Sequence, residues 1–300
     1  MHSLASTLTR IGAVPVLRLG WLKGIHPPEW VALVFFVYLG LLGLFQRLAL
    51  TPRLILFAAP AVLCTLWWLE ASRSSTRSKE IRQWSSLGLI LLGYWSLGWF
   101  SSAPMESWQM VWTGWDRALL DTFHLRDAVE VTGAFVPSML ESVYLLLYTI
   151  PPISLGVVYG FGGRARANRY LLVLFLGTFS TYALLPLFPA ISPRVAFPGS
   201  DLPHFSSTAR GINTWLLDHL DIATSVFPSG HVAVAFSSAF GLLAVLRQRR
   251  MVWMTAFVAA SAVYVATVYG RYHYAVDGLA SAGITAAAWK ISTQLRVDEN

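Results

Sequence analysis

Residues 227–231, Phe-Pro-Ser-Gly-His, open an apolar run that continues to about residue 246. A second polar stretch, His-Tyr-Ala-Val-Asp at residues 273–277, opens another apolar run that ends near residue 292. Both runs approach the roughly 20 residues that a helix needs to cross the apolar core of a bilayer. We therefore expect one site built from the first turns of two membrane helices.

Similar apolar runs fill most of the 300 residues and predict an all-α fold, a polytopic membrane helical bundle. The chain is 55% hydrophobic and only 12% charged, whereas a typical soluble domain is about 25% charged. About eight runs have the length and composition of transmembrane helices. They cover residues 29–49, 53–71, 84–102, 137–160, 169–188, 229–246, 252–269 and 274–292.

The positions of these runs also predict the domain organisation. We expect a cytoplasmic or interfacial N-terminal segment over residues 1–28. Accessory membrane helices should follow over residues 29–135, and a membrane core should occupy residues 136–300. Both polar stretches fall in this core, so the chemistry is expected in the C-terminal half.

The distribution of positive charge predicts how the chain is oriented. The formal net charge is +7, which in a soluble protein would suggest nucleic-acid binding. Here the basic residues cluster in short loops, and with eight spans 15 of the 22 Lys and Arg residues fall on the N-terminal side. Because cytoplasmic loops are enriched in Lys and Arg, we expect cytoplasmic termini and no nucleic-acid partner. Residues 189–228 and 270–274 are then extracytoplasmic, facing a periplasm or a lumen.

The segment 103–135 should also lie outside the membrane core. Trp108, Trp112 and Trp115 recur with helical spacing, but Asp116 and its charged neighbours interrupt the apolar character. We expect an extracytoplasmic amphipathic helix with its tryptophans in the headgroup layer. Such a helix could be a lid or lipid-entry wall, or only a membrane anchor.

The stretch around Ser229 has the features of an anion-binding helix start. Pro228 suits a turn or first helical position, and Ser229 is a good N-cap. The free N–H groups of a first turn bind phosphate, and Gly230 would let the anion approach the backbone. His231, in the same turn, could donate a proton to a leaving oxygen.

His273 and Asp277 are four residues apart and so lie on one face of a helix. A carboxylate beside an imidazole fixes the tautomer and supports the cation that forms when the other ring nitrogen attacks. His273 is therefore a candidate nucleophile towards phosphorus. Two histidines, one nucleophile and one acid, suit a two-step phosphoryl transfer.

Two arginines are candidate phosphate clamps. Arg194 ends a proline-rich stretch, residues 185–194, in which the prolines should stop a helix and stiffen the loop. Arg271 lies two residues before His273. A guanidinium can hold phosphate oxygens with two parallel hydrogen bonds, and the charge of the transition state needs such donors.

Other polar residues carry no predicted role. Asp218 and Asp221 could suggest a metal site, but a third positioned ligand is lacking. Cys64 is the only cysteine, which excludes an intrachain disulfide and a multi-thiolate metal site. Glu141, near the outer end of its span, is left unassigned. The remaining histidines outside residues 1–28 are expected to be ordinary loop residues: His124, His204 and His219.

Phe-Pro-Ser-Gly-His at residues 227–231, followed one helix later by His-x-x-x-Asp at residues 273–277, resembles the type 2 phosphatidic acid phosphatase superfamily. The resemblance covers about residues 169–292. It implies a helical core with three motifs on one membrane face. It also implies a role for each matching position: Ser229 and Gly230 bind phosphate, His231 is the acid, His273 is the nucleophile and Asp277 orients it.

The first motif departs from the family pattern of Lys, six residues and Arg-Pro. Leu187 stands seven residues before Arg194, and Val195 follows it. Thr267 stands where the family has an arginine six residues before the nucleophilic histidine. The stretch 182–194 is more similar to the inositol phosphorylceramide synthase branch, which transfers lipid-linked phosphate headgroups to an alcohol.

The sequence thus predicts an integral membrane lipid phosphatase or phosphotransferase. It would act on a phosphorylated lipid at the extracytoplasmic face, through a phosphohistidine intermediate, and would require no metal or organic cofactor. The acceptor stays open between water and an alcohol, the second being headgroup transfer of the inositol-phosphate type. Rival interpretations are a lipid-phosphate carrier or flippase without chemistry, and a purely structural membrane subunit.

Overall fold

The computed structural model describes residues 25–71, 76–199, 201–222, 224 and 226–295. Within these residues the regular elements are helices and none is a β-strand, so the all-α prediction is confirmed. Most of the N-terminal segment predicted as cytoplasmic or interfacial, residues 1–24, lies outside the described residues.

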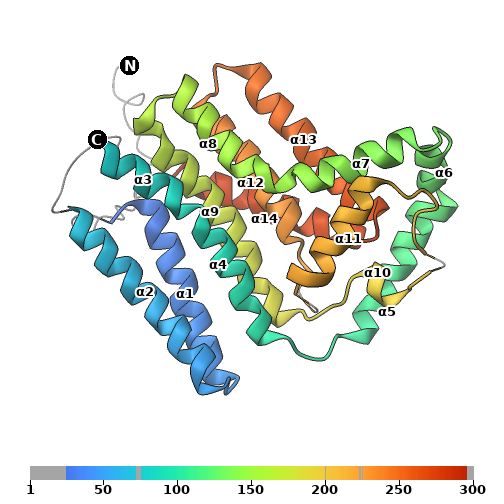
Figure 1. The fold of residues 1–300 in the computed structure, drawn as a ribbon, viewed down its shortest axis with the longest axis horizontal. Coiled ribbons are helices and arrows are strands. Elements are labelled where there is room, and N and C mark those ends of the chain that lie inside the picture. Colours follow the sequence, from blue (N-terminus) through green and yellow to red (C-terminus); the bar gives the residue numbers. More distant parts are fainter. Residues whose placement is uncertain (1–24, 72–75, 200, 223, 225, 296–300) are drawn as a thin grey trace, which may run out of the picture.

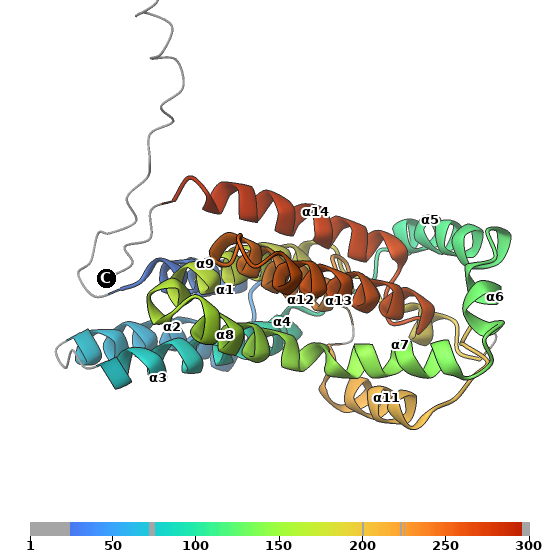
Figure 2. The ribbon, with the colours of Figure 1, turned by 90° about the horizontal axis from the view of Figure 1, so that it is seen from above.

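Helix α9 (Ala167–Leu184) forms the centre of the bundle. It contacts α1 (Pro27–Phe45), α12 (Gly230–Val245) and α14 (Ala275–Ser292) (Figure 1, Figure 2). Over the apolar stretch of Arg164–Leu187, 72% of the residues are buried, against 28% for α13 (Arg250–Tyr269). α9 is apolar on nearly all sides, which is typical of a helix that is buried inside a protein or a membrane.

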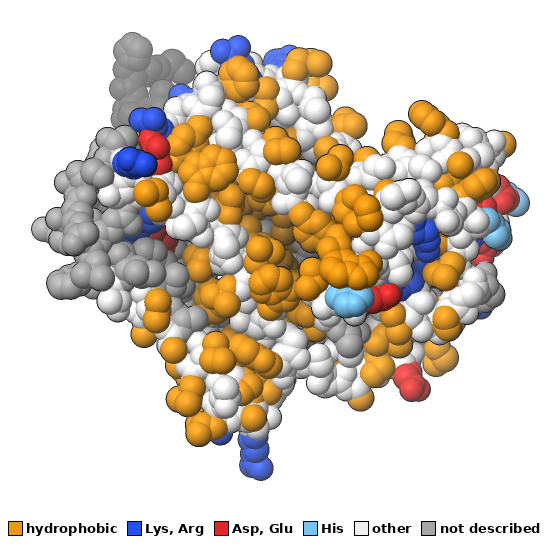
Figure 3. Space-filling view, viewed as in Figure 1, with side chains coloured by type: hydrophobic (Ala, Val, Ile, Leu, Met, Phe, Trp, Pro, Cys, Tyr) orange, Lys and Arg blue, Asp and Glu red, His pale blue; other side chains and the backbone are white. Residues whose placement is uncertain are grey.

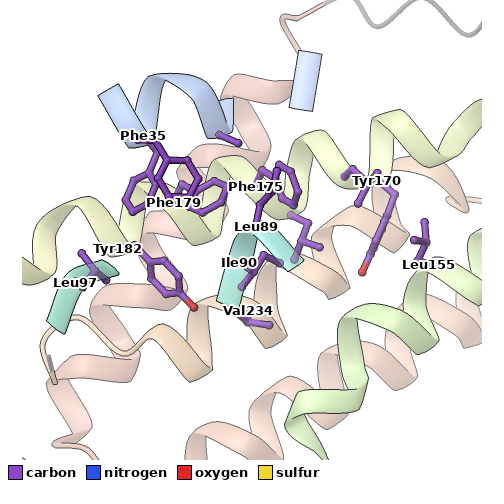
Figure 4. Close-up of a cluster of buried hydrophobic side chains, with 14 of the residues drawn as sticks. Phe35, Leu89, Ile90, Leu97, Leu155, Tyr170, Phe175, Phe179, Tyr182 and Val234 are labelled. Atoms are coloured by element: carbon purple, nitrogen blue, oxygen red, sulfur yellow. The ribbon is translucent and has the colours of Figure 1, made fainter. Parts of the chain in front are cut away.

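Aromatic packing and one glycine fix the neighbours of α9. The Phe35 ring of α1 stacks on Phe179 of α9 with 4.6 Å between ring centroids, in the cluster drawn in Figure 4. On the other side, a Cβ added at Gly177 would lie 2.1 Å from Oγ of Ser237 on α12. The close approach of α9 and α12 therefore requires glycine, as is common where membrane helices pack tightly.

Among the described residues, four helical segments are long and apolar enough to cross a membrane: Pro27–Phe45, Phe135–Phe161, Arg164–Leu187 and Arg250–Tyr269. Shorter apolar helices cover Leu50–Val62 and Gly230–Val245. Every one of the eight predicted ranges contains helix, but the count of eight spans stays a prediction.

The remaining helices complete the bundle and its loops. They are α2 (Leu50–Ala71), α3 (Thr76–Ser86), α4 (Gly88–Leu97), α5 (Glu106–Arg117), α6 (Leu125–Glu130), α7 (Phe135–Leu146), α8 (Ile150–Phe161), α10 (Pro193–Ala196) and α11 (Thr208–Leu220).

The surface of the bundle is strongly apolar. Phe45, Val258 and Leu279 are among the large hydrophobic side chains that stand mostly outside the packed interior. In the view of Figure 3, hydrophobic side chains are spread over the middle of the molecule, with few charged side chains among them. Exposed apolar patches of this extent are rare on proteins in water, whereas they suit a protein surrounded by lipid.

The segment 103–135 is helical but not one helix. It contains α5, a short π-helical turn at Ala118–Thr122 and α6, and His124 has a left-handed φ of 55° before α6 begins. Trp108 and Trp115 of α5 are exposed, while Trp112 is buried. One face of α5 therefore packs on the core and the other is exposed, and its place in the headgroup layer stays a prediction.

Candidate functional site

The first turns of α12 and α14 are joined by direct hydrogen bonds. Ser229 is the N-cap of α12, where its Oγ accepts from the N–H of Val232 at 3.3 Å. The N–H of Ser229 donates to the carbonyl of Asp277, and Oγ of Ser281 donates to the carbonyl of Ser229 at 2.9 Å. The structure thus brings the two predicted helix starts together as one unit.

Gly230 follows the cap at a position where no side chain fits. A Cβ there would lie 2.8 Å from the ring of Tyr182 on α9. The first N–H groups of α12 have no acceptors within the helix and carry the positive end of its dipole. Packing therefore requires the glycine that we expected for anion binding, and both reasons apply to the same position.

The two predicted catalytic histidines are in direct contact. Nδ1 of His231 lies 3.2 Å from Nε2 of His273. Nδ1 of His273 lies 3.0 Å from the carbonyl of Val226 and 3.3 Å from Oδ2 of Asp277. We call His231 and His273 the imidazole pair. Asp277 is held in turn, because the N–H of Tyr274 donates to its Oδ2 at 2.8 Å.

These partners assign the tautomers. A carbonyl oxygen only accepts, so Nδ1 of His273 carries the proton and its Nε2 has a free lone pair. Nδ1 of His231 must then donate to that lone pair. Burial lowers the pKa of His273 to about 4, although the charge of Asp221 and the hydrogen bond to Val226 oppose the shift. His273 is therefore a neutral imidazole at pH 7, the form that attacks phosphorus.

A wall of tyrosines surrounds His231. The rings of Tyr144, Tyr148 and Tyr94 have centroids 5.4, 6.0 and 6.4 Å from the His231 ring. The Tyr148 hydroxyl is 3.5 Å from Nε2 of His231, and the Tyr94 hydroxyl donates to Asp221. These tyrosines were not predicted from the sequence, because they come from α4 and the α7–α8 region and follow no motif.

Arg271, one of the two predicted phosphate clamps, is completely buried and ion-paired. Its Nη1 lies 2.6 Å from Oδ2 of Asp116, and its Nη2 lies 2.6 Å from Oδ2 of Asp201. Oδ1 of Asp116 also accepts from the N–H of Ala275, in the first turn of α14. The left-handed φ of Arg271, 64°, is a costly conformation for a non-glycine residue, and these contacts hold it. The geometry favours a structural role for Arg271, and phosphate binding by it stays a prediction.

The buried face of α5 braces both polar stretches. The Trp112 ring stacks on Phe227 at 4.8 Å and packs against Tyr274 at 5.8 Å. Nε2 of Gln109 donates to the carbonyl of Ile191 at 3.2 Å. Because Asp116 belongs to the same helix, α5 contacts the starts of α12 and α14 as well as the proline-rich loop. A simple membrane anchor would not need the contacts that the buried face of α5 makes with the site.

Arg194, the other predicted clamp, has a more open environment. Its N–H donates to the carbonyl of Arg271 at 2.9 Å, and its Nη1 lies 2.7 Å from Oδ1 of Asp218, whose side chain is 51% exposed. Nε of Arg194 is buried and has no hydrogen-bond partner among the described residues. Arg194 thus has one partner at the surface and spare donor capacity.

Glu141, to which no role was assigned, connects α7 to the turn that contains Tyr272 and His273. Its buried carboxylate accepts from Arg210 at 2.7 Å, from Asn213 at 2.9 Å and from the Tyr272 hydroxyl at 2.6 Å. The Tyr272 ring in turn stacks on Tyr144 at 4.3 Å, and Tyr144 packs against the imidazole pair. A single buried carboxylate in an apolar run was the available signal for this network.

No group of three or more His, Cys, Asp or Glu residues is placed to hold a metal ion within the part of the chain that the structure describes. Asp218 contacts Arg194, and Asp221 contacts Tyr94. Asp221 also accepts from the N–H of Ile222 at 2.9 Å, so both carboxylates have protein hydrogen-bond partners.

Comparison with known proteins identifies the family. The sequence pattern of the PAP2 superfamily matches residues 115–291. The chain is also 33% identical, over 113 residues, to a PA-phosphatase related-family protein of Dictyostelium discoideum, and the match covers 36% of this chain and 20% of that protein. No solved structure matches the chain. The superfamily match spans more than half of the chain and includes both helix starts and the proline-rich loop, so this integral membrane protein belongs to the PAP2 superfamily.

Proposed function

We propose that the protein transfers the phosphoryl or phosphodiester group of a phosphorylated lipid through a phosphohistidine on His273. The observation that carries the proposal is the contact of 3.2 Å between His231 Nδ1 and His273 Nε2, with Nε2 unprotonated. The family and the printed description of the Dictyostelium relative support a phosphorylated lipid as the substrate.

The first step forms a bond between His273 Nε2 and phosphorus and breaks the bond between phosphorus and the lipid oxygen. The leaving oxygen takes a proton from His231, which acts as the imidazolium and becomes a neutral imidazole. In the second step a water or alcohol oxygen attacks phosphorus, the P–N bond breaks, and His231 takes the proton of the attacking group. Asp277 supports the charge that develops on His273 through Nδ1.

The direct contact within the imidazole pair constrains how substrate enters. Phosphorus cannot lie between two nitrogens that are 3.2 Å apart. The phosphate must therefore approach beside the line that joins the rings and replace the hydrogen bond between them. The Ser229 hydroxyl, the first N–H groups of α12 from Gly230 onward and the guanidinium of Arg194 are the donors proposed to bind its oxygens, because the N–H of Ser229 is already bonded to the carbonyl of Asp277.

The position of the site relative to the membrane is part of the proposal. Arginines are more numerous at the loops on the N-terminal side, which supports cytoplasmic termini and an extracytoplasmic site. The tryptophans on the free face of α5 would then lie in the outer headgroup layer.

A second function, headgroup transfer to an alcohol, rests on the proline-rich stretch before Arg194. That stretch carries α10, and Arg194 is held there by the backbone of residue 271. Hydrolysis and transfer share the first step and differ in the acceptor. A carrier or flippase would use the same pocket without covalent chemistry.

The test is incubation of the purified protein with radiolabelled phosphatidic acid in mixed micelles, with and without glycerol or inositol. Release of free phosphate supports hydrolysis, and labelled glycerol phosphate or inositol phosphate supports transfer to an alcohol. His273→Ala should abolish both products, whereas the matched control His124→Ala, an exposed histidine outside the site, should retain them. Turnover that survives in His273→Ala would contradict the proposal, and binding without any product would favour the carrier.

A further inference from the structure

A cavity lies at the C-terminal end of α12, whereas the imidazole pair lies at the N-terminal end of this helix. It has a volume of about 430 Å³ and is lined by the end of α8, the start of α9, the end of α12 and the loop that leads to α13. The 16 residues of α12 separate it from the first site by about 24 Å of helix. Figure 1 shows these helix ends meeting on one side of the bundle.

Four arginines from two separate segments line this cavity. They are Arg166, Arg169, Arg247 and Arg249, and we call the hollow the arginine cavity. The described residues that line it include no Asp or Glu. Like charges gathered around one hollow repel one another, and an anion inside the hollow would offset that repulsion.

The described contacts of Arg166, Arg247 and Arg249 leave the charge of these three arginines in place. Nη1 of Arg166 donates to the carbonyl of Val245, and Nη1 of Arg169 donates to the carbonyl of Leu295, both at 3.0 Å. The Arg249 guanidinium lies over the Phe161 ring, 5.4 Å from its centroid. Carbonyls and an aromatic face orient a guanidinium without neutralising it, and each guanidinium has five N–H donors.

The enrichment of basic residues at one membrane face explains why arginines are frequent here. It does not require them to converge on one hollow from the start of α9 and from the α12–α13 loop. Phe161 forms an apolar wall that is 56% exposed. A guanidinium cluster beside an exposed aromatic side chain at helix ends matches the chemistry of a phospholipid headgroup and its glycerol.

We propose that the arginine cavity binds a phosphate group, that of an anionic phospholipid in the leaflet remote from the imidazole pair. The guanidinium groups of Arg247 and Arg249 hold the phosphate oxygens, and the acyl chains leave along Phe161 onto the apolar surface of the bundle. This site does not depend on the function proposed for the histidines. Free inorganic phosphate has the same recognition chemistry, so the experiment must separate the two sources.

The experiment follows thermal unfolding of the full chain in non-ionic detergent during titration with phosphatidylglycerol, phosphatidylcholine or inorganic phosphate. Phosphatidylglycerol should raise the midpoint temperature of the wild type, because a ligand that binds only the folded state stabilises it. In the double variant Arg247→Gln/Arg249→Gln the apparent dissociation constant should rise by about tenfold or more. The matched control is Arg250→Gln, an exposed neighbour that does not line the cavity.

The outcomes are separable. A phosphatidylglycerol shift that is weakened in the double variant and kept in Arg250→Gln supports the lipid site. The same pattern with inorganic phosphate assigns the cavity to a free anion and overturns the lipid part of the proposal. Equal shifts in the double variant and the wild type, or equal shifts with phosphatidylcholine, overturn the proposal as a whole. The single variants Arg247→Gln and Arg249→Gln repeat the test if the double variant unfolds.

Discussion

Arg194 and Arg271 are two arginines with the same predicted role and opposite surroundings. They are neighbours in the fold, because the N–H of Arg194 donates to the carbonyl of Arg271. Arg271 is completely buried between two carboxylates, whereas Arg194 has one half-exposed carboxylate partner and an unpartnered Nε among the described residues. A guanidinium whose charge is already neutralised has little left to offer a phosphate. Pairing and burial, rather than residue type, therefore separate a structural arginine from a candidate clamp.

The largest effect that this comparison predicts is on stability. Asp116→Ala removes one partner of the buried Arg271 charge and should cost about 3–5 kcal/mol, because a buried charge is then left uncompensated. Thermal unfolding in detergent should show a much lower midpoint temperature. Asp121→Ala is the matched control, since Asp121 is exposed and pairs weakly with Arg126. Equal stability of Asp116→Ala and the control would show that Arg271 is not held as described.

The pH dependence of stability tests how deeply His273, two residues from Arg271, is buried. Its pKa is about 4 in the folded protein, against the ordinary value of 6.5 for the unfolded chain. Between these values the unfolded chain binds a proton that the native chain does not, so stability falls as pH falls from 6.5 to 4. This group contributes up to about 3 kcal/mol of that loss.

The measurement is the midpoint temperature of the wild type and of His273→Gln across the same pH range. The variant lacks the group and should lose less stability than the wild type. The exposed His124 provides the control, because His124→Gln should follow the wild type. Parallel curves for all three proteins would contradict a buried, neutral His273.

The open arginine should affect catalysis rather than folding. Arg194→Gln is expected to lower kcat/KM for a phosphorylated lipid about 100-fold, the typical cost of one lost donor to transition-state charge. Its midpoint temperature should fall far less than that of Asp116→Ala, because its partner Asp218 is 51% exposed and such ion pairs contribute about 0–1 kcal/mol. Arg117→Gln, on the exposed side of α5, is the control for loss of a positive charge. If Arg194→Gln strongly lowers the midpoint temperature but leaves kcat/KM unchanged, the roles of the two arginines have been assigned the wrong way round.

The smallest predicted effect is at Asp218, which competes with phosphate for Arg194. Asp218→Asn should leave stability within about 1 kcal/mol and lower KM for the phosphorylated lipid at low salt. A steady-state titration checks the change, and added salt should reduce it. An increase in KM would mean instead that Asp218 positions Arg194.

The sequence predicted the architecture because apolar runs and helix starts are local signals. The all-α class, the family and the meeting of the 227–231 and 273–277 stretches needed only those runs and two short motifs. The number of spans is harder to predict from the sequence, because several helices, such as α12, are short for a bilayer.

The surroundings of the site could not be predicted in the same way. Arg271 finds its partners 155 and 70 positions away, at Asp116 and Asp201, and no periodicity connects such residues. The tyrosines around His231 come from separate elements and have no motif of their own. Only packing shows that α5 braces the site, because an amphipathic pattern reveals that a helix has two faces and not what each face meets.

The most direct test of the central claim is to find the phosphoryl group on His273 during turnover. Purified protein would be mixed with labelled phosphatidic acid, quenched in base to preserve a phosphoramidate, digested and analysed by mass spectrometry. The account predicts phosphate on the peptide that contains His273 in the wild type, and none in His273→Ala or in the absence of substrate. Phosphate on another residue, or turnover by the wild type with no covalent adduct at any quench time, would contradict it.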